Sequence, residues 1–100
     1  MGVLIVRMDQ KQRDRLPAIF SDIGFPEPTF THREGVVRYS FRFGFLRRLS
    51  VDVFEVERPN GMTYDLWIPP TRSGGELFEA LRERGYSRVP GDKNETTKSG

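Results

Sequence analysis

The sequence contains no cysteine and a single histidine. The missing thiol excludes disulfides, thiolate nucleophiles and cysteine-based metal sites, and one histidine cannot form a histidine-rich metal site. No apolar run approaches the roughly 20 residues that a membrane-spanning helix needs. The apolar start at residues 3–6 is also too short for a signal peptide. We therefore expect a cytoplasmic protein with no membrane partner, no cofactor and no metal ion.

Lysine is also scarce, because thirteen of the cationic residues are arginine and three are lysine. Arginine favours bidentate and stacked contacts that suit phosphate or carboxylate groups, although the codon bias of a GC-rich genome explains the same excess. The net charge is only +2, but its distribution is uneven. Residues 31–50 contain five arginines and one glutamate, whereas residues 51–65 contain four acidic residues and one arginine. This distribution predicts one basic region on the surface.

The length of 100 residues allows one hydrophobic core and hence one domain. Apolar residues are spread over residues 1–90, which we assign to a single α+β domain. Residues 91–100 are polar and contain no apolar anchor, so we expect them to form a disordered tail.

The N-terminal region predicts a strand and then a helix. Residues 3–8 form a short apolar run, rich in β-branched residues, that is typical of a strand buried on both faces. Pro17 is compatible only with a first helical turn, so we expect the helix to begin near Asp14 and to end at Gly24. The apolar face of this helix follows a 3.6-residue period and consists of Leu16, Ile19, Phe20 and Ile23.

Two hairpins are predicted in the middle of the chain. In the first, polar and apolar residues alternate over residues 36–43 and again over residues 49–54. A three-residue loop at residues 45–47 would keep the apolar faces together and pair Phe41 with Val51.

The second hairpin is predicted from Asn60 and Gly61, which are typical of a type I′ turn. A two-residue turn at this position pairs Phe54 with Trp67. Pro69 and the proline after it end the strand.

A second helix is predicted after this hairpin. Ser73 and Glu76 have the spacing of a capping box, Gly85 stands where the helix would end, and residues 86–89 offer a short final edge strand. The fold class that follows is α+β. It consists of a mainly antiparallel sheet of about four strands in β-α-β-β-β-α order, with two amphipathic helices packed mostly on one face.

The predicted registers divide the sheet into an apolar face and a mixed face. The apolar face contains Tyr39, Phe41, Phe43, Leu49, Val51, Val53, Leu66 and Ile68. The mixed face contains Arg38, Ser40, Arg42, Asp52, Phe54 and Trp67. If both helices cover the apolar face, Phe54 and Trp67 lie beside arginines in water, which suits stacked bases and phosphates or a protein-binding hot spot. Two alternatives stay open: a helix or the chain end covers this face, or Arg38 lies over both aromatic rings as a cation–π lid.

Catalytic patterns are weak. His32 lies in what we interpret as a solvent-facing turn, with no orienting partner visible. Residues 73–75 could open a helix onto a phosphate, but the sequence has neither the phosphate-loop pattern nor the dinucleotide-binding pattern, and the capping box explains these residues. Glu55, Glu57 and Asp65 lack the spacing of a metal motif. We therefore expect a protein that is not an enzyme.

The order helix–strand–strand–strand–helix between Leu16 and Gly85 is similar to that of the double-stranded RNA-binding domain and of HicA-type mRNA interferases. The resemblance is one of topology. Here the last helix begins without the lysines of the first family, and His32 precedes Gly35 where the second family has its histidine after a glycine. We assign the chain to neither family.

We interpret the chain as a small binding module that contacts nucleic acid. The candidate residues are Arg38, Arg42, Phe54 and Trp67 on the mixed face, together with Arg47 and Arg48 at the tip of the first hairpin. The alternative is a regulatory or structural domain that binds another protein, or its own copy as a homo-oligomer, through the same face.

Overall fold

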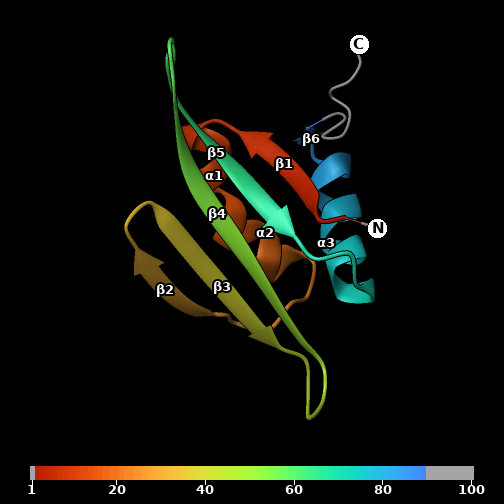
Figure 1. Cartoon of the computed structure of the whole chain (residues 1–100). Helices are drawn as coiled ribbons and strands as arrows, with labels where there is room; N and C mark the ends of the chain where they lie inside the picture. The colour runs from red at the N-terminus through yellow and green to blue at the C-terminus, as the bar shows by residue number, and fades with distance from the viewer. Residues whose placement is uncertain (1, 90–100) are drawn as a thin grey trace.

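The computed structural model describes residues 2–89, and within this range the chain is an α+β domain with six strands and three helices (Figure 1). The elements are β1 (Leu4–Met8), α1 (Gln10–Asp14), α2 (Leu16–Asp22), β2 (Thr29–Arg33), β3 (Val36–Arg42), β4 (Arg48–Arg58), β5 (Gly61–Ile68), α3 (Arg72–Glu83) and β6 (Ser87–Arg88). The tail predicted at residues 91–100 lies outside the described residues. None of the described helices is both long enough and apolar enough to cross a membrane.

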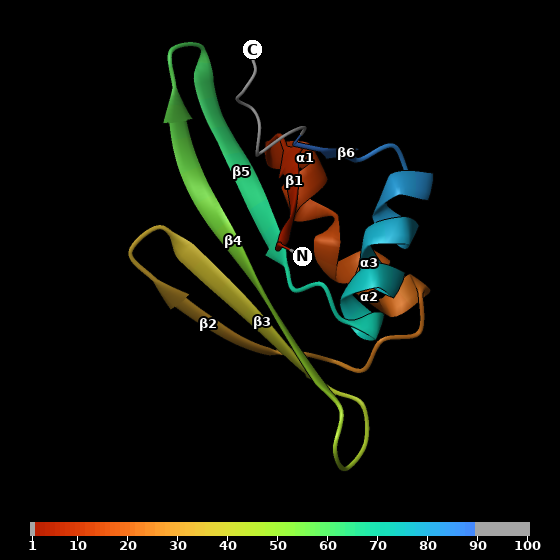
Figure 2. The same cartoon turned by 45° about the vertical axis from the view of Figure 1, so that its right-hand side comes forward.

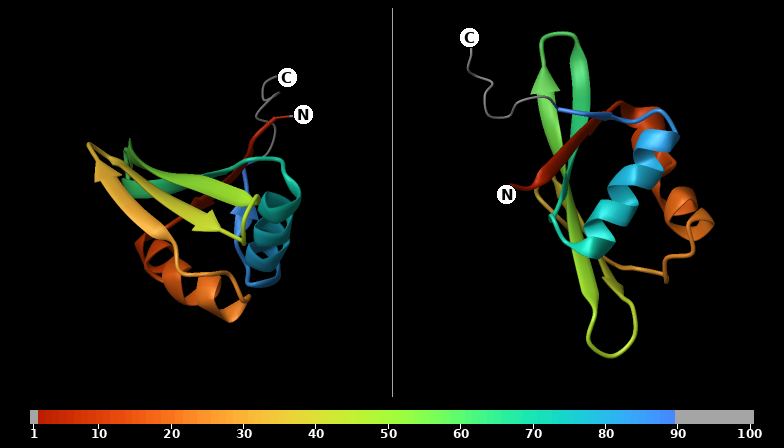
Figure 3. Two further views of the ribbon diagram at one scale, coloured as in Figure 1. Left: turned by 90° about the horizontal axis from the view of Figure 1, so that it is seen from below. Right: turned by 90° about the vertical axis from the view of Figure 1, so that its right-hand side faces the viewer.

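The six strands form one antiparallel sheet in the order β2-β3-β4-β5-β1-β6. The α+β class and the helices on one side of the sheet are as predicted, and Figure 3 shows the helices gathered on that side. The expected count of about four strands and two helices is wrong. The element β2 was missed because it is short and polar and follows two prolines, and α1 was missed because it has no apolar face.

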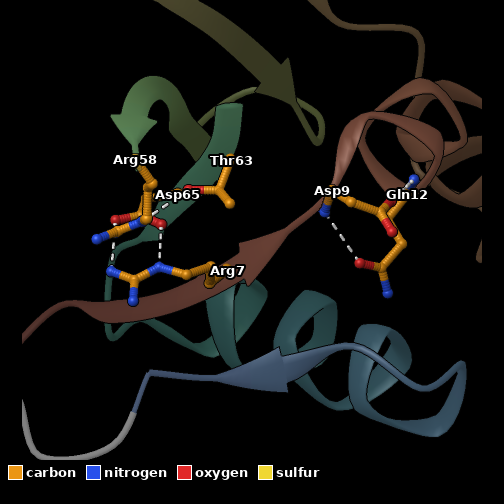
Figure 4. A network of polar contacts seen from close by, with 6 residues as sticks. All are labelled: Arg7, Asp9, Gln12, Arg58, Thr63 and Asp65. Atoms are coloured by element: carbon orange, nitrogen blue, oxygen red, sulfur yellow. Dashed lines mark hydrogen bonds and ion pairs between the residues drawn. The ribbon is translucent and has the colours of Figure 1, made fainter. Parts of the chain in front are cut away.

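The first helical region is two helices and not one. Asp9 caps α1 in a capping box: the Gln12 N–H donates to Asp9 Oδ1 at 2.8 Å, and the Asp9 N–H donates to Gln12 Oε1 at 3.1 Å (Figure 4). The second helix starts at Leu16, close to the predicted boundary, with Pro17 in its first turn. The capping box stabilises a helix that buries none of its own residues.

The N-terminus of α3 also differs from the prediction. Thr71, and not Ser73, is the N-cap, and its Oγ1 accepts a hydrogen bond from the Gly74 N–H at 3.1 Å. Ser73 is buried inside the first turn. A Cβ on Gly74 would collide with the carbonyl oxygen of Pro69, so the capping turn lies directly against the end of β5.

Both hairpin registers are shifted by two residues from those predicted. In the first hairpin Phe41 pairs with Leu49, and in the second Trp67 pairs with Asp52. The second turn is not type I′, because Gly61 has a positive φ (135°) and Asn60 does not. Side chains alternate with a period of two, so a shift of two residues moves the partners but leaves every side chain on its predicted face.

The core lies between the apolar face of the sheet and the helices. The predicted apolar residues of β3, β4 and β5 are buried, apart from the half-buried Phe43. The Phe20 ring on α2 packs edge-to-face on Phe41 with 4.9 Å between ring centroids. The prediction that residues 3–8 are buried on both faces is wrong: Val6 and Met8 are buried, but Arg7 is exposed on the opposite face.

Candidate functional site

The face of the sheet opposite the helices is uncovered in the described part of the chain (Figures 1 and 3). We call it the open face. The pairing registers place the following side chains on it: Ile5, Arg7, Thr29, Thr31, Arg33, Val36, Arg38, Ser40, Arg42, Arg48, Ser50, Asp52, Phe54, Val56, Arg58, Thr63, Asp65, Trp67 and Ser87. All six predicted mixed-face residues are among them. The alternative in which a helix covers this face is therefore wrong for the described residues.

An aromatic pair occupies the middle of the open face. The Phe54 and Trp67 rings are tilted against each other with 5.1 Å between centroids. They meet diagonally, because the residue directly opposite Trp67 on β4 is Asp52. Trp67 is 41% exposed, so part of its indole ring is available to a ligand.

Arg38 is engaged by an acidic partner. Its Nε and Nη2 donate to the two carboxylate oxygens of Asp52 at 2.8 and 3.1 Å. These hydrogen bonds, followed by the charge of Asp52, raise the pKa of Arg38 above its ordinary value. The described contacts of Arg38 do not include the stacking over Phe54 and Trp67 that the sequence left open. The bidentate pair instead holds the guanidinium beside the aromatic pair.

A second pair of the same kind lies on the other side of the aromatic pair and was not foreseen from the sequence. Arg7 on β1 donates to both oxygens of Asp65 at 2.9 and 3.2 Å (Figure 4). The hydrogen bond to Asp65 raises the pKa of Arg7, and Asp65 is itself buried. Nearby, Arg58 Nε donates to Thr63 Oγ1 at 3.0 Å. The Arg7–Asp65 pair could not be predicted from the sequence, because the two residues are 58 positions apart and meet only when β1 pairs with β5.

Arg42 and Arg48 stand directly opposite each other at the far end of the open face. Both are exposed, and neither takes part in an ion pair among the described residues. They line a shallow hollow together with Glu27, Thr29, Ser40, Phe41 and Ser50. The hydroxyl oxygens of the two serines are 3.2 Å apart. Like charges directly opposite on a sheet destabilise it, so an anion between these guanidinium groups would relieve their repulsion.

The tip of the β3–β4 hairpin projects beyond the body of the domain (Figure 2). Phe45 and Leu46 are 92% and 86% exposed there. From the sequence these two residues were predicted only as part of a loop and not as candidate binding residues. The available signal was a pair of large apolar residues in a loop between two amphipathic strands.

Arg47, at the base of the tip, contacts both α3 and the residue that follows β3. Its Nη2 donates to Ser73 Oγ on α3 at 2.7 Å, and its guanidinium lies over the Phe43 ring at 5.0 Å from the centroid. The Phe43 N–H closes the loop by donating to the Arg47 carbonyl oxygen at 2.9 Å. The structure therefore separates two neighbours that the sequence treated alike: Arg47 is bound to the protein, and Arg48 faces the solvent.

The weak catalytic candidates are not brought together. His32 lies on β2 and not in a turn, and it is exposed. Glu55 and Glu57 lie on the face opposite Asp65. Within residues 2–89 no group of three or more histidine, cysteine or acidic side chains is arranged to hold a metal ion.

Comparisons with protein-family models, with curated proteins and with solved structures each found no match to this chain. The topological similarity noted from the sequence is also reduced, because four strands and not three separate α2 from α3. The functional argument therefore depends on the geometry of the open face.

Proposed function

We propose that this domain is a non-enzymatic module that binds single-stranded nucleic acid on its open face, with the hairpin tip as a further contact. The observation that carries the proposal is the exposed pair of Arg42 and Arg48, which lie opposite each other and form no ion pair among the described residues, with Glu27 lining the same hollow. Two arginines that are direct neighbours on adjacent strands suit a phosphate, to which arginine binds in a bidentate manner.

The charge of the whole open face supports the same ligand. Its strands contribute six arginines, Arg7, Arg33, Arg38, Arg42, Arg48 and Arg58, and two aspartates, Asp52 and Asp65, while Glu27 and Glu34 line hollows on the same face. Each aspartate neutralises one arginine through a bidentate pair. The remaining arginines attract a polyanion, and the affinity of such a site depends steeply on salt concentration.

The aromatic pair supports a single strand over a duplex. Trp67 presents part of its ring, and unpaired bases stack on such rings irrespective of their sequence. Arg48 and Asp52 are four residues apart on β4, so the arginine pair and Trp67 are separated by about 13 Å along the strand. A short single strand can therefore place its phosphates on Arg42 and Arg48 and a base on Trp67.

A protein partner is the second candidate, and the exposed tip favours it. Phe45 and Leu46 are adjacent, almost fully exposed and preorganised by Arg47. Aromatic residues and arginine are enriched at protein-binding hot spots, so the tip and Trp67 would then be the anchors of an interface.

The test is the binding of a fluorescein-labelled mixed-sequence 12-nucleotide single strand, followed by anisotropy over a range of salt concentrations. Changing both Arg42 and Arg48 to Gln should lower the slope of log K against log salt by about 1.4, since each phosphate contact contributes about 0.7. The matched control is the Arg82→Gln and Arg84→Gln double variant, which removes the same charge from exposed positions in the last turn and at the C-cap of α3. The proposed site would be refuted if the parent protein did not bind the single strand, or if the control variant weakened binding as much as the Arg42 and Arg48 variant.

Trp67 separates the two candidates, because it is the chain's single tryptophan. For nucleic acid, Trp67→Ala should weaken binding by about 1–3 kcal/mol, roughly 5- to 150-fold, and Trp67→Phe should retain most of the affinity. In the parent, the single strand should quench the indole fluorescence. If the open face binds protein instead, nucleic acid will leave the emission unchanged, and the emission will change with protein concentration or with a partner.

A further inference from the structure

The two edge strands of the sheet, β6 and β2, differ in how much unpaired backbone they expose. At one edge β6 is only two residues long, which leaves little backbone to pair. At the other edge β2 is five residues long, all five are exposed, and within residues 2–89 its outer side pairs with no other strand. A free edge is a template for pairing with another chain, and proteins usually protect it with proline, lysine, a bulge or a covering segment. Within β2 the one charged side chain is that of Arg33, at the end of the strand, and Pro28 lies just before its start.

The backbone groups that β2 offers can be identified from its turn. Glu34 and Gly35 form a two-residue connection, and Arg33 pairs with Val36. In a two-residue hairpin the closing pair exchanges hydrogen bonds, and the pattern then alternates along the strand. The N–H and C=O groups of Phe30 and His32 therefore point away from the sheet.

We propose that a second copy of this chain pairs with the first through β2, antiparallel about a two-fold axis at Thr31. This register overlaps all five residues of the strand with all five of its partner. It places Phe30 opposite His32 of the partner subunit, where the outward backbone groups of the two strands meet. It places Thr31 opposite Thr31 of the partner subunit in a pair without mutual hydrogen bonds, and it requires no new conformation of β2.

The side chains of β2 are complementary to their own copy in this register. The helix-side pair of Phe30 with His32 of the partner subunit is aromatic, and the open-face pair at the axis is Thr with Thr; both kinds of pair stabilise a sheet. Arg33 lies opposite Thr29 of the partner subunit, so no like charges meet.

Phe30 adds an apolar contact to the backbone pairing. It is 58% exposed and packs edge-to-face on Tyr39 with 5.5 Å between ring centroids. It also borders an apolar hollow between β2 and α2 that includes Pro17, Phe25 and Pro28. Pairing through β2 would cover this ring and join the two sheets into one, with the two open faces side by side. The proposal does not depend on what the open face binds.

The test uses the absence of cysteine, because Thr31→Cys introduces the sole thiol of the chain. In the proposed dimer the Cα atoms of the two Thr31 residues are about 4.5 Å apart, within the range that a disulfide spans. The matched control is Thr29→Cys on the same strand and the same face, where the two thiols are separated by about 13 Å along the strand. Under mild oxidation at equal concentration, Thr31→Cys should form covalent dimer about tenfold or more faster than Thr29→Cys.

Light scattering after size-exclusion chromatography provides the second measurement, over protein concentrations from micromolar to millimolar. The parent should move from monomer to dimer mass, and Phe30→Lys should stay monomeric with an unchanged circular dichroism spectrum, because a charge on an edge strand opposes pairing. A parent that is monomeric throughout overturns the proposal. So does a dimer that persists in Phe30→Lys, or equal cross-linking of the two cysteine variants, because either places the contact elsewhere.

Discussion

The clearest prediction concerns Arg47 and Arg48, which are adjacent in sequence and have opposite roles. Arg47→Ala removes the hydrogen bond to Ser73 and the contact with Phe43. Hydrogen bonds to charged groups contribute about 1.5–3 kcal/mol, and an exposed cation–π contact about 0.5–1 kcal/mol. Because Arg47 is exposed to water, which weakens both contacts, we expect a loss of about 1–2 kcal/mol from the free energy of unfolding, less than the sum of the two contributions.

Arg48→Ala removes a side chain without a described ion pair and relieves its repulsion with Arg42. We therefore expect a change within about 0.5 kcal/mol of zero. In a domain of this size a loss of 1 kcal/mol lowers the Tm by roughly 4–8 °C, so thermal unfolding followed by circular dichroism will separate the two variants.

A double-mutant cycle isolates the contact. The combined Arg47→Ala and Ser73→Ala variant should be less destabilised than the sum of the single variants, because both remove the same hydrogen bond. In the nucleic-acid assay the order reverses: Arg48→Ala should lower the salt slope more than Arg47→Ala. Equal stability of the two single variants, or strict additivity with Ser73→Ala, would refute the structural role given to Arg47.

Three further predictions concern stability and the tip. Gly74→Ala should destabilise the fold by about 1–3 kcal/mol, because the added methyl group collides with Pro69. Gly75→Ala has open space in the same helix and should stabilise the fold by about 0.5–1 kcal/mol. Urea denaturation measures both changes, and effects of the same sign would contradict the packing of α3 on β5. Changing Phe45 and Leu46 together to Ser should leave the Tm unchanged, because both side chains are exposed, and should weaken ligand binding; a Tm lowered by several degrees would show that the tip is structural. Burial raises the pKa of Tyr39 and of Tyr86 above the ordinary value of 10.0. The unfolded chain therefore loses these protons at a lower pH than the folded protein, and the free energy of unfolding should fall as the pH rises above about 10. Urea midpoints that stay constant between about pH 8 and 11 would contradict the burial of these phenols.

The sequence was sufficient to assign side chains to the two faces of the central strands. Alternation over β3, β4 and β5 placed Phe41, Val51 and Leu66 in the core and Arg38, Arg42 and Trp67 on the open face. The partners were wrong by two residues in each hairpin. Matching the apolar faces predicted a three-residue loop in the first hairpin, where residues 43–47 form the loop, and turn chemistry predicted Asn60 and Gly61 in the second, where Pro59 and Asn60 form the turn. A two-residue error preserves the faces, which explains why the candidate surface was predicted although its pairs were not.

Other features depended on contacts between distant segments. The N-cap at Thr71 was missed because Ser73 fits a cap equally well by sequence. In the structure Ser73 is instead buried in the first turn, where it accepts a hydrogen bond from Arg47. The strand β2 has no apolar alternation that predicts it and forms against β3 by backbone pairing. The Arg7–Asp65 pair likewise exists only because β1 enters the sheet beside β5.

The sequence by itself therefore determined the local features that follow from side-chain period and turn chemistry: a cysteine-free α+β domain, a sheet with one apolar face, and arginines beside aromatics on the other. Only the tertiary structure decided which of those arginines are available. Asp52 and Ser73 engage Arg38 and Arg47, while Arg42 and Arg48 are left opposite each other. The physical reason is that the charge of a side chain is a property of its residue, but its hydrogen-bonding partner is set by which strands and helices come to lie beside it.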